Sequence, residues 1–207
     1  AEYLLASSSS CFISSHICSI NSKLVKQLSI SSKLGRSPLC NLGYISFNNI
    51  DKFSTPKDLD SIKEIISGAV KKYENTVHTI GISTAGAVNN ENTGVLGSTG
   101  NLVENYPELD FQKISRLPVF VENDANCVAL AEKWLGNGVD YNNFICITIG
   151  TAIGGAIVIN GELYKSKNNI SGEFGYMIIN DPFNAFNTKD YGNLASTREL
   201  VRMGSKE

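Results

Sequence analysis

Three short stretches decide the fold that this sequence predicts: VENDAN at 121–126, TIGTAIGG at 148–155 and NISGEFGYM at 169–177. Each lies among apolar, β-branched residues of the kind that form strands. The first stretch places a carboxylate, Asp124, where an apolar run gives way to an amphipathic helical pattern. The second is a glycine-rich turn, and the third places Glu173 between Gly172 and Gly175, where the backbone can approach a ligand closely. Two carboxylates and a phosphate-sized turn together indicate phosphoryl transfer to a polar acceptor.

In this order and spacing, the three stretches resemble the sugar kinases of the ROK family. The resemblance covers roughly residues 44–203, and its motifs are specific between residues 80 and 177. It implies an α/β protein with part of the actin/hexokinase-type fold, a two-lobed, ribonuclease H-like ATPase fold. It also implies ATP-dependent phosphorylation of a hexose hydroxyl, with C6 as the expected acceptor.

The composition fits a soluble globular protein, because 42% of the 207 residues are apolar and 18% are charged. The net charge of −2 provides no basic patch for nucleic acid or an anionic membrane, and no apolar run approaches the length of a membrane span. The five cysteines show no Cys-x-x-Cys spacing. We therefore expect reduced thiols and a cytoplasmic location.

The chain divides by composition and by resemblance into residues 1–40, a smaller α/β lobe at 41–118 and a larger lobe at 119–207. Residues 1–40 carry twelve serines, against eleven in the rest of the chain. One interpretation is a flexible Ser-rich tail. The resemblance suggests another, in which a frameshifted or misassembled start replaces the native opening, and in which the larger lobe also ends early. The other reading frames of the encoding DNA would test this hypothesis.

The resemblance implies an opening strand and a glycine-rich hairpin of the Asp-x-Gly-Gly-Thr type, which cradles the nucleotide phosphates and holds Mg²⁺. No such string occurs in residues 1–40. The expected magnesium-binding aspartate is therefore not found, although ATP and Mg²⁺ remain the cofactors that the resemblance implies.

Periodicity places the regular elements. Apolar residues on one helical face predict helices at 57–73, 124–135 and 193–204. Strands are predicted at 44–47, 77–83, 119–123, 144–149 and 156–159, with a hairpin over 156–164 that turns at Asn160-Gly161, a preferred two-residue turn.

Asp124 allows two interpretations, which do not exclude each other. Aspartate is a common N-cap at a strand-to-helix junction. It also suits a general base that accepts the proton of an attacking sugar hydroxyl. The resemblance implies the second role, with Asn123 orienting a neighbouring hydroxyl and Glu173 accepting hydrogen bonds from the sugar near its anomeric carbon. Without that context, Glu173 reads as an exposed loop residue.

The glycine turn is expected to bind phosphate through its backbone N–H groups and the Thr151 hydroxyl. It is not a Walker A motif, because no Gly-Lys-Ser/Thr follows. It resembles the family's second phosphate loop, with alanine in place of glycine at Ala152 and Ala156. The Ala152 methyl is expected to oppose a left-handed backbone angle at a cost of about 1 kcal/mol. The expected nucleotide contacts are Gly150, Thr151, Gly154 and Gly155.

The resemblance also implies sugar contacts at Gly86, Thr99 and Asn101. Tyr176 stands where many members have a histidine, and no cysteine cluster follows it. We therefore expect no zinc and no metal ligand set, as in the zinc-free branch that includes β-glucoside kinases.

A non-catalytic protein is the alternative: an inert sugar-binding remnant, or the effector domain of a regulator, without the first phosphate loop. Family repressors carry a helix-turn-helix before the kinase-like part, and residues 1–40 lack the helix signals and basic clusters for one. The partner we expect is a hexose. Members of the family are often dimers, so a homodimer is an allowed assembly, and the sequence does not identify the sugar.

Overall fold

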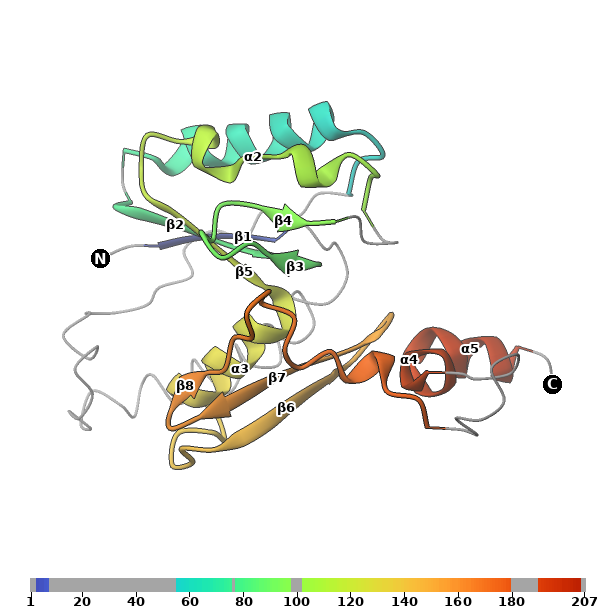
Figure 1. Ribbon diagram of the computed structural model, residues 1–207. Helices are drawn as coiled ribbons and strands as arrows, with labels where there is room; N and C mark the ends of the chain where they lie inside the picture. The colour runs from blue at the N-terminus through green and yellow to red at the C-terminus, as the bar shows by residue number, and fades with distance from the viewer. Residues whose placement is uncertain (1–2, 8–54, 76, 98–101, 180–189, 206–207) are drawn as a thin grey trace. The chain divides into compact units, whose positions relative to one another are not determined.

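The structure is a computed structural model that describes residues 3–7, 55–75, 77–97, 102–179 and 190–205 (Figure 1). The predicted strand at 44–47 lies outside these ranges. Two compact units make up the chain, Ala1–Asn123 and Asp124–Glu207, which we call unit 1 and unit 2. The predicted lobes meet five residues earlier, after Pro118. The difference arises because the strand at 119–123 pairs with a strand of unit 1.

A parallel sheet of three strands forms the centre of unit 1, with β2 (Thr79–Thr84) between β1 (Tyr3–Ser7) and β5 (Val119–Asn123). The prediction of β5 is confirmed at both ends, and that of β2 within two residues. No strand was predicted in residues 1–40, so β1 is a correction. Its sequence lacks sustained alternation, and pairing with β2 decides its conformation.

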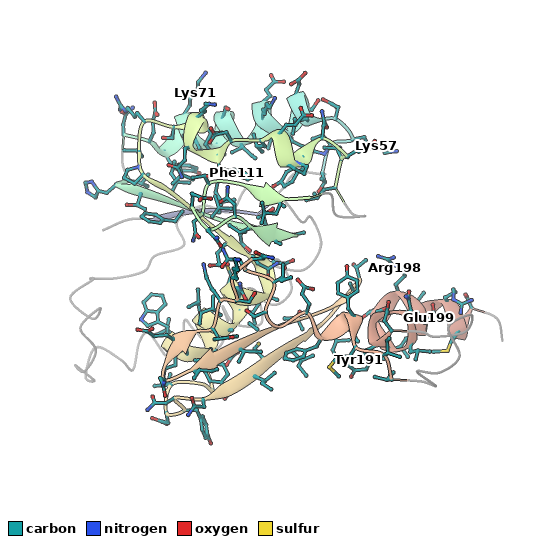
Figure 2. All side chains as sticks on the ribbon, in the orientation of Figure 1. Lys57, Lys71, Phe111, Tyr191, Arg198 and Glu199 are labelled. Carbon is teal, nitrogen blue, oxygen red and sulfur yellow. The ribbon has the colours of Figure 1, made fainter. Side chains whose placement is uncertain are left out.

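Unit 1 also contains helix α2 (Leu59–Tyr73), which confirms the helix predicted at 57–73 (Figure 1). Asp58 caps it by accepting a hydrogen bond from the Ser61 N–H at 2.8 Å. The buried stripe of α2 and the sheet's apolar side chains share one core with Phe111, which is 0% exposed (Figure 2). Besides Phe111, this core contains Leu59, Ile62, Ile66, Val70, Ile80, Ile82, Val88, Val95, Tyr106, Leu109, Val119 and Val121.

Between β2 and β5, the chain forms a small hairpin that the sequence did not predict. It consists of β3 (Ala87–Val88) and β4 (Val95–Leu96), followed by the 3-10 helices η1 (Tyr106–Glu108) and η2 (Phe111–Ile114). The Asn89 side chain stabilises the connection, because Oδ1 accepts from the Thr93 N–H at 2.8 Å and Nδ2 donates to Thr93 Oγ1 at 2.8 Å. Side-chain bonds of this local kind replace a turn signal such as Asn-Gly.

Unit 2 contains an antiparallel sheet of β6 (Phe144–Ile149), β7 (Ile153–Ile159) and β8 (Glu162–Leu163), against which α3 (Asp124–Leu135) packs. The bounds of α3 and β6 are as predicted. The β7–β8 turn is also confirmed, since Asn160 and Gly161 both have positive φ, 55° and 83°. Strand β7 begins three residues earlier than predicted. Gly154 and Gly155 therefore lie in a strand, and the glycine turn shrinks to residues 150–152.

The face of this sheet opposite α3 is exposed along β6 within the described residues, whereas on β7 the same face is buried at Ile153 and Gly155. Residues of β6 alternate between half-buried and exposed, and the three exposed ones are apolar: Ile145 (58%), Ile147 (50%) and Ile149 (52%). The half-buried residues Phe144 and Cys146 point to the α3 side. We call the row of these three isoleucines on β6 the open face.

The C-terminal segment differs from its prediction. A single helix was expected at 193–204, but the structure has α4 (Tyr191–Ala195) and α5 (Thr197–Gly204) (Figures 1 and 2). Ser196 is extended and breaks the run, and its Oγ accepts from the Glu199 N–H at 3.4 Å as an N-cap. The Ser-x-x-Glu pattern at 196–199 is a signal for the start of a helix, but the apolar periodicity continues across it and so predicted one unbroken helix. Among the described residues, no helix has the length and apolarity to cross a membrane.

Candidate active site

Asp124 is the first residue of α3 and follows directly on β5. It is half-buried, and its Oδ1 accepts a hydrogen bond from the Ala125 N–H at 2.9 Å. Burial raises the pKa of the Asp124 carboxyl above its ordinary value, and the backbone hydrogen bonds oppose this shift. The carboxylate thus serves the first turn of the helix and still has a pKa closer to neutrality, which suits a proton acceptor.

Glu173 lies in the loop between β8 and η3 (Phe174–Tyr176). Gly172 before it has a φ of 84°, a conformation that favours glycine. Glu173 occupies the cap position of η3, but its side chain makes no cap hydrogen bond. Glu173 is an exposed loop residue by its accessible surface, but partial desolvation of its carboxyl raises the pKa, and the negative charge of Asp124 raises it further. The structure therefore brings the two predicted carboxylates within electrostatic reach of each other, inside unit 2.

The turn at residues 150–152 connects β6 to β7, and its Thr151 and Ala152 are exposed. The Gly150 N–H donates to the Ala152 carbonyl at 2.9 Å, and the Gly150 carbonyl accepts from the Thr197 N–H at 2.9 Å. These bonds fix the turn beside the start of α5. The Thr151 side chain is exposed, and a hydroxyl beside a glycine turn is of the kind that can bind phosphate. Ala152 is not among the described residues with positive φ, so the backbone cost expected for its methyl does not apply.

Gly154 and Gly155, the other expected nucleotide contacts, are the second and third residues of β7. Gly154 pairs with Thr148 and Gly155 pairs with Ile147 of β6. Their backbone groups therefore belong to a strand and not to the exposed turn.

Unit 1 holds two of the residues expected to contact sugar. Asn123, the last residue of β5, donates from Nδ2 to the Gly86 carbonyl at 3.0 Å. Gly86 has a φ of 93°, so its turn requires glycine. Thr99 and Asn101 lie outside the described residues, so their expected roles stay predictions.

Some residues around the site were not singled out from the sequence. Thr84 Oγ1 and the Tyr106 hydroxyl share a buried hydrogen bond of 3.0 Å at the carboxyl end of β2, close in sequence to Gly86. In unit 2, the ring of Phe174 lies against Gly155. An aromatic residue beside a motif glutamate was the available signal for Phe174, whereas the Thr84–Tyr106 pair joins positions 22 residues apart and had none.

No group of three or more His, Cys, Asp or Glu residues in the described ranges is arranged to hold a metal ion. The donor set for Mg²⁺ is accordingly unassigned. Asp124 and Glu173 are a pair, and the roles they fit are proton transfer and hydrogen bonding to hydroxyl groups.

Comparison with known proteins places this arrangement in context. A model of the ROK family matches residues 49–193. A β-glucoside kinase from Listeria monocytogenes is 43% identical over 133 residues, which cover 62% of this chain and 44% of the relative. The chain thus spans less than half the length of this curated relative.

Solved structures of ROK family proteins are also similar to this chain. A ROK family protein from Streptococcus pneumoniae, in complex with sucrose, is 34% identical, with a TM-score of 0.62 over 75% of this chain and 53% of that one. A ROK family glucokinase from Streptomyces griseus, in complex with glucose and AMPPNP, is 31% identical, with a TM-score of 0.62 over 73% of this chain and 51% of that one. These neighbours confirm the predicted fold class: an α/β protein with part of the actin/hexokinase-type fold.

Proposed function

Because the chain belongs to the ROK family, we propose that it serves ATP-dependent transfer of the γ-phosphoryl group to a hexose hydroxyl, with the hydroxyl at C6 as the acceptor. The observation that carries the proposal is the Asp124–Glu173 pair, two carboxyls of raised pKa in one unit. The β-glucoside kinase and glucokinase among its relatives support a hexose or a hexoside as the substrate class.

Asp124 is the proposed general base. It accepts the proton of the sugar hydroxyl while that oxygen attacks the γ-phosphorus and the bond from phosphorus to the ADP oxygen breaks. A base works best when its pKa lies near the working pH. The burial that raises the pKa of Asp124 therefore makes it a stronger acceptor than an exposed aspartate.

Glu173 is the proposed sugar ligand in unit 2, because its carboxylate is not used in capping η3. Asn123 and Gly86, joined by their hydrogen bond, are proposed sugar contacts in unit 1, together with Thr99 and Asn101. Each hydrogen bond between a sugar hydroxyl and a charged carboxylate contributes about 1.5–3 kcal/mol.

The nucleotide is proposed to place its phosphates against Gly150 and Thr151 in the exposed turn; Gly154 and Gly155, also expected as nucleotide contacts, lie in the strand that follows this turn. Mg²⁺, when bound with ATP, supplies charge neutralisation at the phosphate oxygens. We assign it no protein ligand. We also propose a cytoplasmic location, no zinc requirement and a homodimer as the assembly to test.

A non-catalytic sugar-binding role is the second candidate. It is favoured by one observation: residues 1–40 contain no Asp-x-Gly-Gly-Thr string, the motif expected to hold Mg²⁺ and to cradle the nucleotide phosphates.

The test is ADP release from Mg·ATP with glucose, N-acetylmannosamine and cellobiose, comparing the parent chain with Asp124→Asn. We expect sugar-dependent ADP release that falls by about 10²–10⁴-fold in the variant. Glu162→Gln, an exposed carboxylate of β8, serves as the control and is expected to keep full activity. Sugar binding without turnover, in protein shown to be folded, would contradict the kinase proposal and support the second candidate.

A further inference from the structure

Strand β7 carries two consecutive glycines, Gly154 and Gly155, whose missing side chains would point to opposite faces of the sheet. Both were expected to contact phosphate. Their surroundings within unit 2 indicate a different use.

On the α3 side of the sheet, the first turn of α3 packs against β7. A Cβ on Gly154 would lie 2.8 Å from Thr148 Oγ1 and 3.3 Å from Ala125 Cβ. Ala125 is 5% exposed and directly follows Asp124. Because position 154 has no side chain, the residue next to Asp124 rests directly on the strand.

On the opposite face, β7 receives the loop that carries Glu173. A Cβ on Gly155 would overlap the ring of Phe174 and would lie 2.9 Å from the Gly172 carbonyl oxygen. A Cβ on Gly172 would in turn lie 2.5 Å from the Gly155 carbonyl oxygen and 2.9 Å from Ala156 Cα. Both chain neighbours of Glu173 are therefore held against the backbone of β7.

We propose that Gly154 and Gly155 are positioning residues, which fix the Asp124 and Glu173 carboxylates relative to each other. Ala125, next to Asp124, packs on one face of β7, and the neighbours of Glu173 pack on the other, because β7 has no side chains at these two positions. The thickness of one backbone then sets the separation of the two carboxylates. The use of this separation in catalysis rests on the proposed function, but the positioning of the two carboxylates does not.

The first experiment needs no catalysis. Carboxyl ¹³C resonances report the pKa of Glu173 in the parent and in Gly155→Ala, each with and without Asp124→Asn. In the parent, removing the Asp124 charge is expected to lower the pKa of Glu173. In Gly155→Ala, the Glu173 loop is displaced, so this response is expected to fall to less than half. An undiminished response would overturn the proposal.

Two further variants make the experiment decisive. Gly204→Ala is the matched control, since outside its own stretch of helix no atom lies within 4 Å of the added Cβ, and it is expected to keep the full response. If Gly155→Ala does not fold, Phe174→Leu leaves β7 intact and removes the ring from Gly155. It is expected to reduce the response in the same way, and an unchanged response in that variant would overturn the proposal.

Kinetics separates positioning from phosphate binding where the chain turns over. Displacing Glu173 is expected to raise the KM for the sugar about 10- to 100-fold in Gly155→Ala and to leave the KM for ATP unchanged. A rise in the KM for ATP alone would identify Gly155 as a phosphate contact and overturn its positioning role. Since the resonance experiment requires no turnover, failure of the kinase proposal would not be mistaken for failure of this one.

Discussion

The two units keep their shape by different means. Unit 1 has a continuous apolar core, in which the buried stripe of α2 joins a parallel sheet. The described part of unit 2 has a buried cluster of Ala129, Ala156 and Val158, with half-buried neighbours and the separately buried Ala125 and Ile153, and exposes isoleucines on its open face. Yet both proposed catalytic-site carboxylates belong to unit 2.

The difference shows that burial and site geometry are separable. In unit 2 the segments that carry Asp124 and Glu173 are located by close backbone approach, at Gly154, Gly155, Gly172 and Gly175. Such contacts add little buried apolar area, but they tolerate almost no displacement.

The largest expected effect tests the contrast in cores. Phe111→Ala in unit 1 is expected to cost about 3–5 kcal/mol of unfolding free energy, because it leaves a large cavity. Val158→Ala in unit 2 removes two methyl groups and is expected to cost about 1–2 kcal/mol. Denaturant unfolding measures both values. A larger loss from Val158→Ala would contradict the comparison.

The next effect tests where the chemistry lies. Glu173→Gln replaces a charged hydrogen-bond acceptor with a neutral amide, and we expect kcat/KM for the sugar to fall about 10- to 100-fold, with unfolding free energy nearly unchanged. Steady-state kinetics checks this, with Glu162→Gln as the exposed control on β8. An equal loss in both variants would remove Glu173 from the site.

A smaller effect concerns stability and pH. Burial raises the pKa of Asp124 in the folded state, so the unfolded chain loses this proton at lower pH and stability falls as the pH rises between the two pKa values. Asp124→Asn keeps an Oδ1 acceptor for the Ala125 N–H and carries no charge. We expect it to raise Tm by about 2–4 °C at neutral pH.

Below the ordinary pKa of aspartate, both proteins are uncharged at this position, so the gain in Tm is expected to disappear. Thermal unfolding followed by circular dichroism at several pH values measures this difference. A lower Tm for the variant at neutral pH would show that the Asp124 charge is stabilising, contrary to the burial argument.

The smallest effect concerns the open face. Ile147 is 50% exposed, so Ile147→Thr is expected to change unfolding free energy by no more than about 0.5 kcal/mol. The same change is expected to reduce self-association, because it interrupts an exposed apolar row on β6, which is an edge strand of the sheet that the structure describes. Light scattering against concentration measures it. Unchanged scattering would show that this row does not drive association.

Much of the fold could be predicted from local pattern. The apolar periodicity of α2 and α3, the β-branched runs of β5 and β6, and the Asn160-Gly161 turn each depend on neighbouring residues alone. β1, the β3–β4 hairpin and the break at Ser196 depend on a partner strand, on Asn89 side-chain bonds and on a cap, which short-range periodicity does not report.

The candidate site shows the same division. Asp124 and Glu173 could be singled out from their motifs, and the structure brings them together. The extent of the glycine turn could not be predicted, because strand β7 begins at Ile153 and therefore includes Gly154 and Gly155. Whether Gly154 and Gly155 face a nucleotide or a neighbouring segment depends on Ala125 and Phe174, far away in sequence.

The bare pair in β7 also bears on engineering. A combinatorial library that altered substrate preference by diversifying residues 154 and 155 would consist mostly of misfolded members, since any side chain collides with a neighbour on one face or the other. The exposed positions 90–91, in the connection between β3 and β4, accept diversity without such collisions. Directed evolution of this chain should therefore vary residues in the connections between strands and keep Gly154 and Gly155 of β7 unchanged.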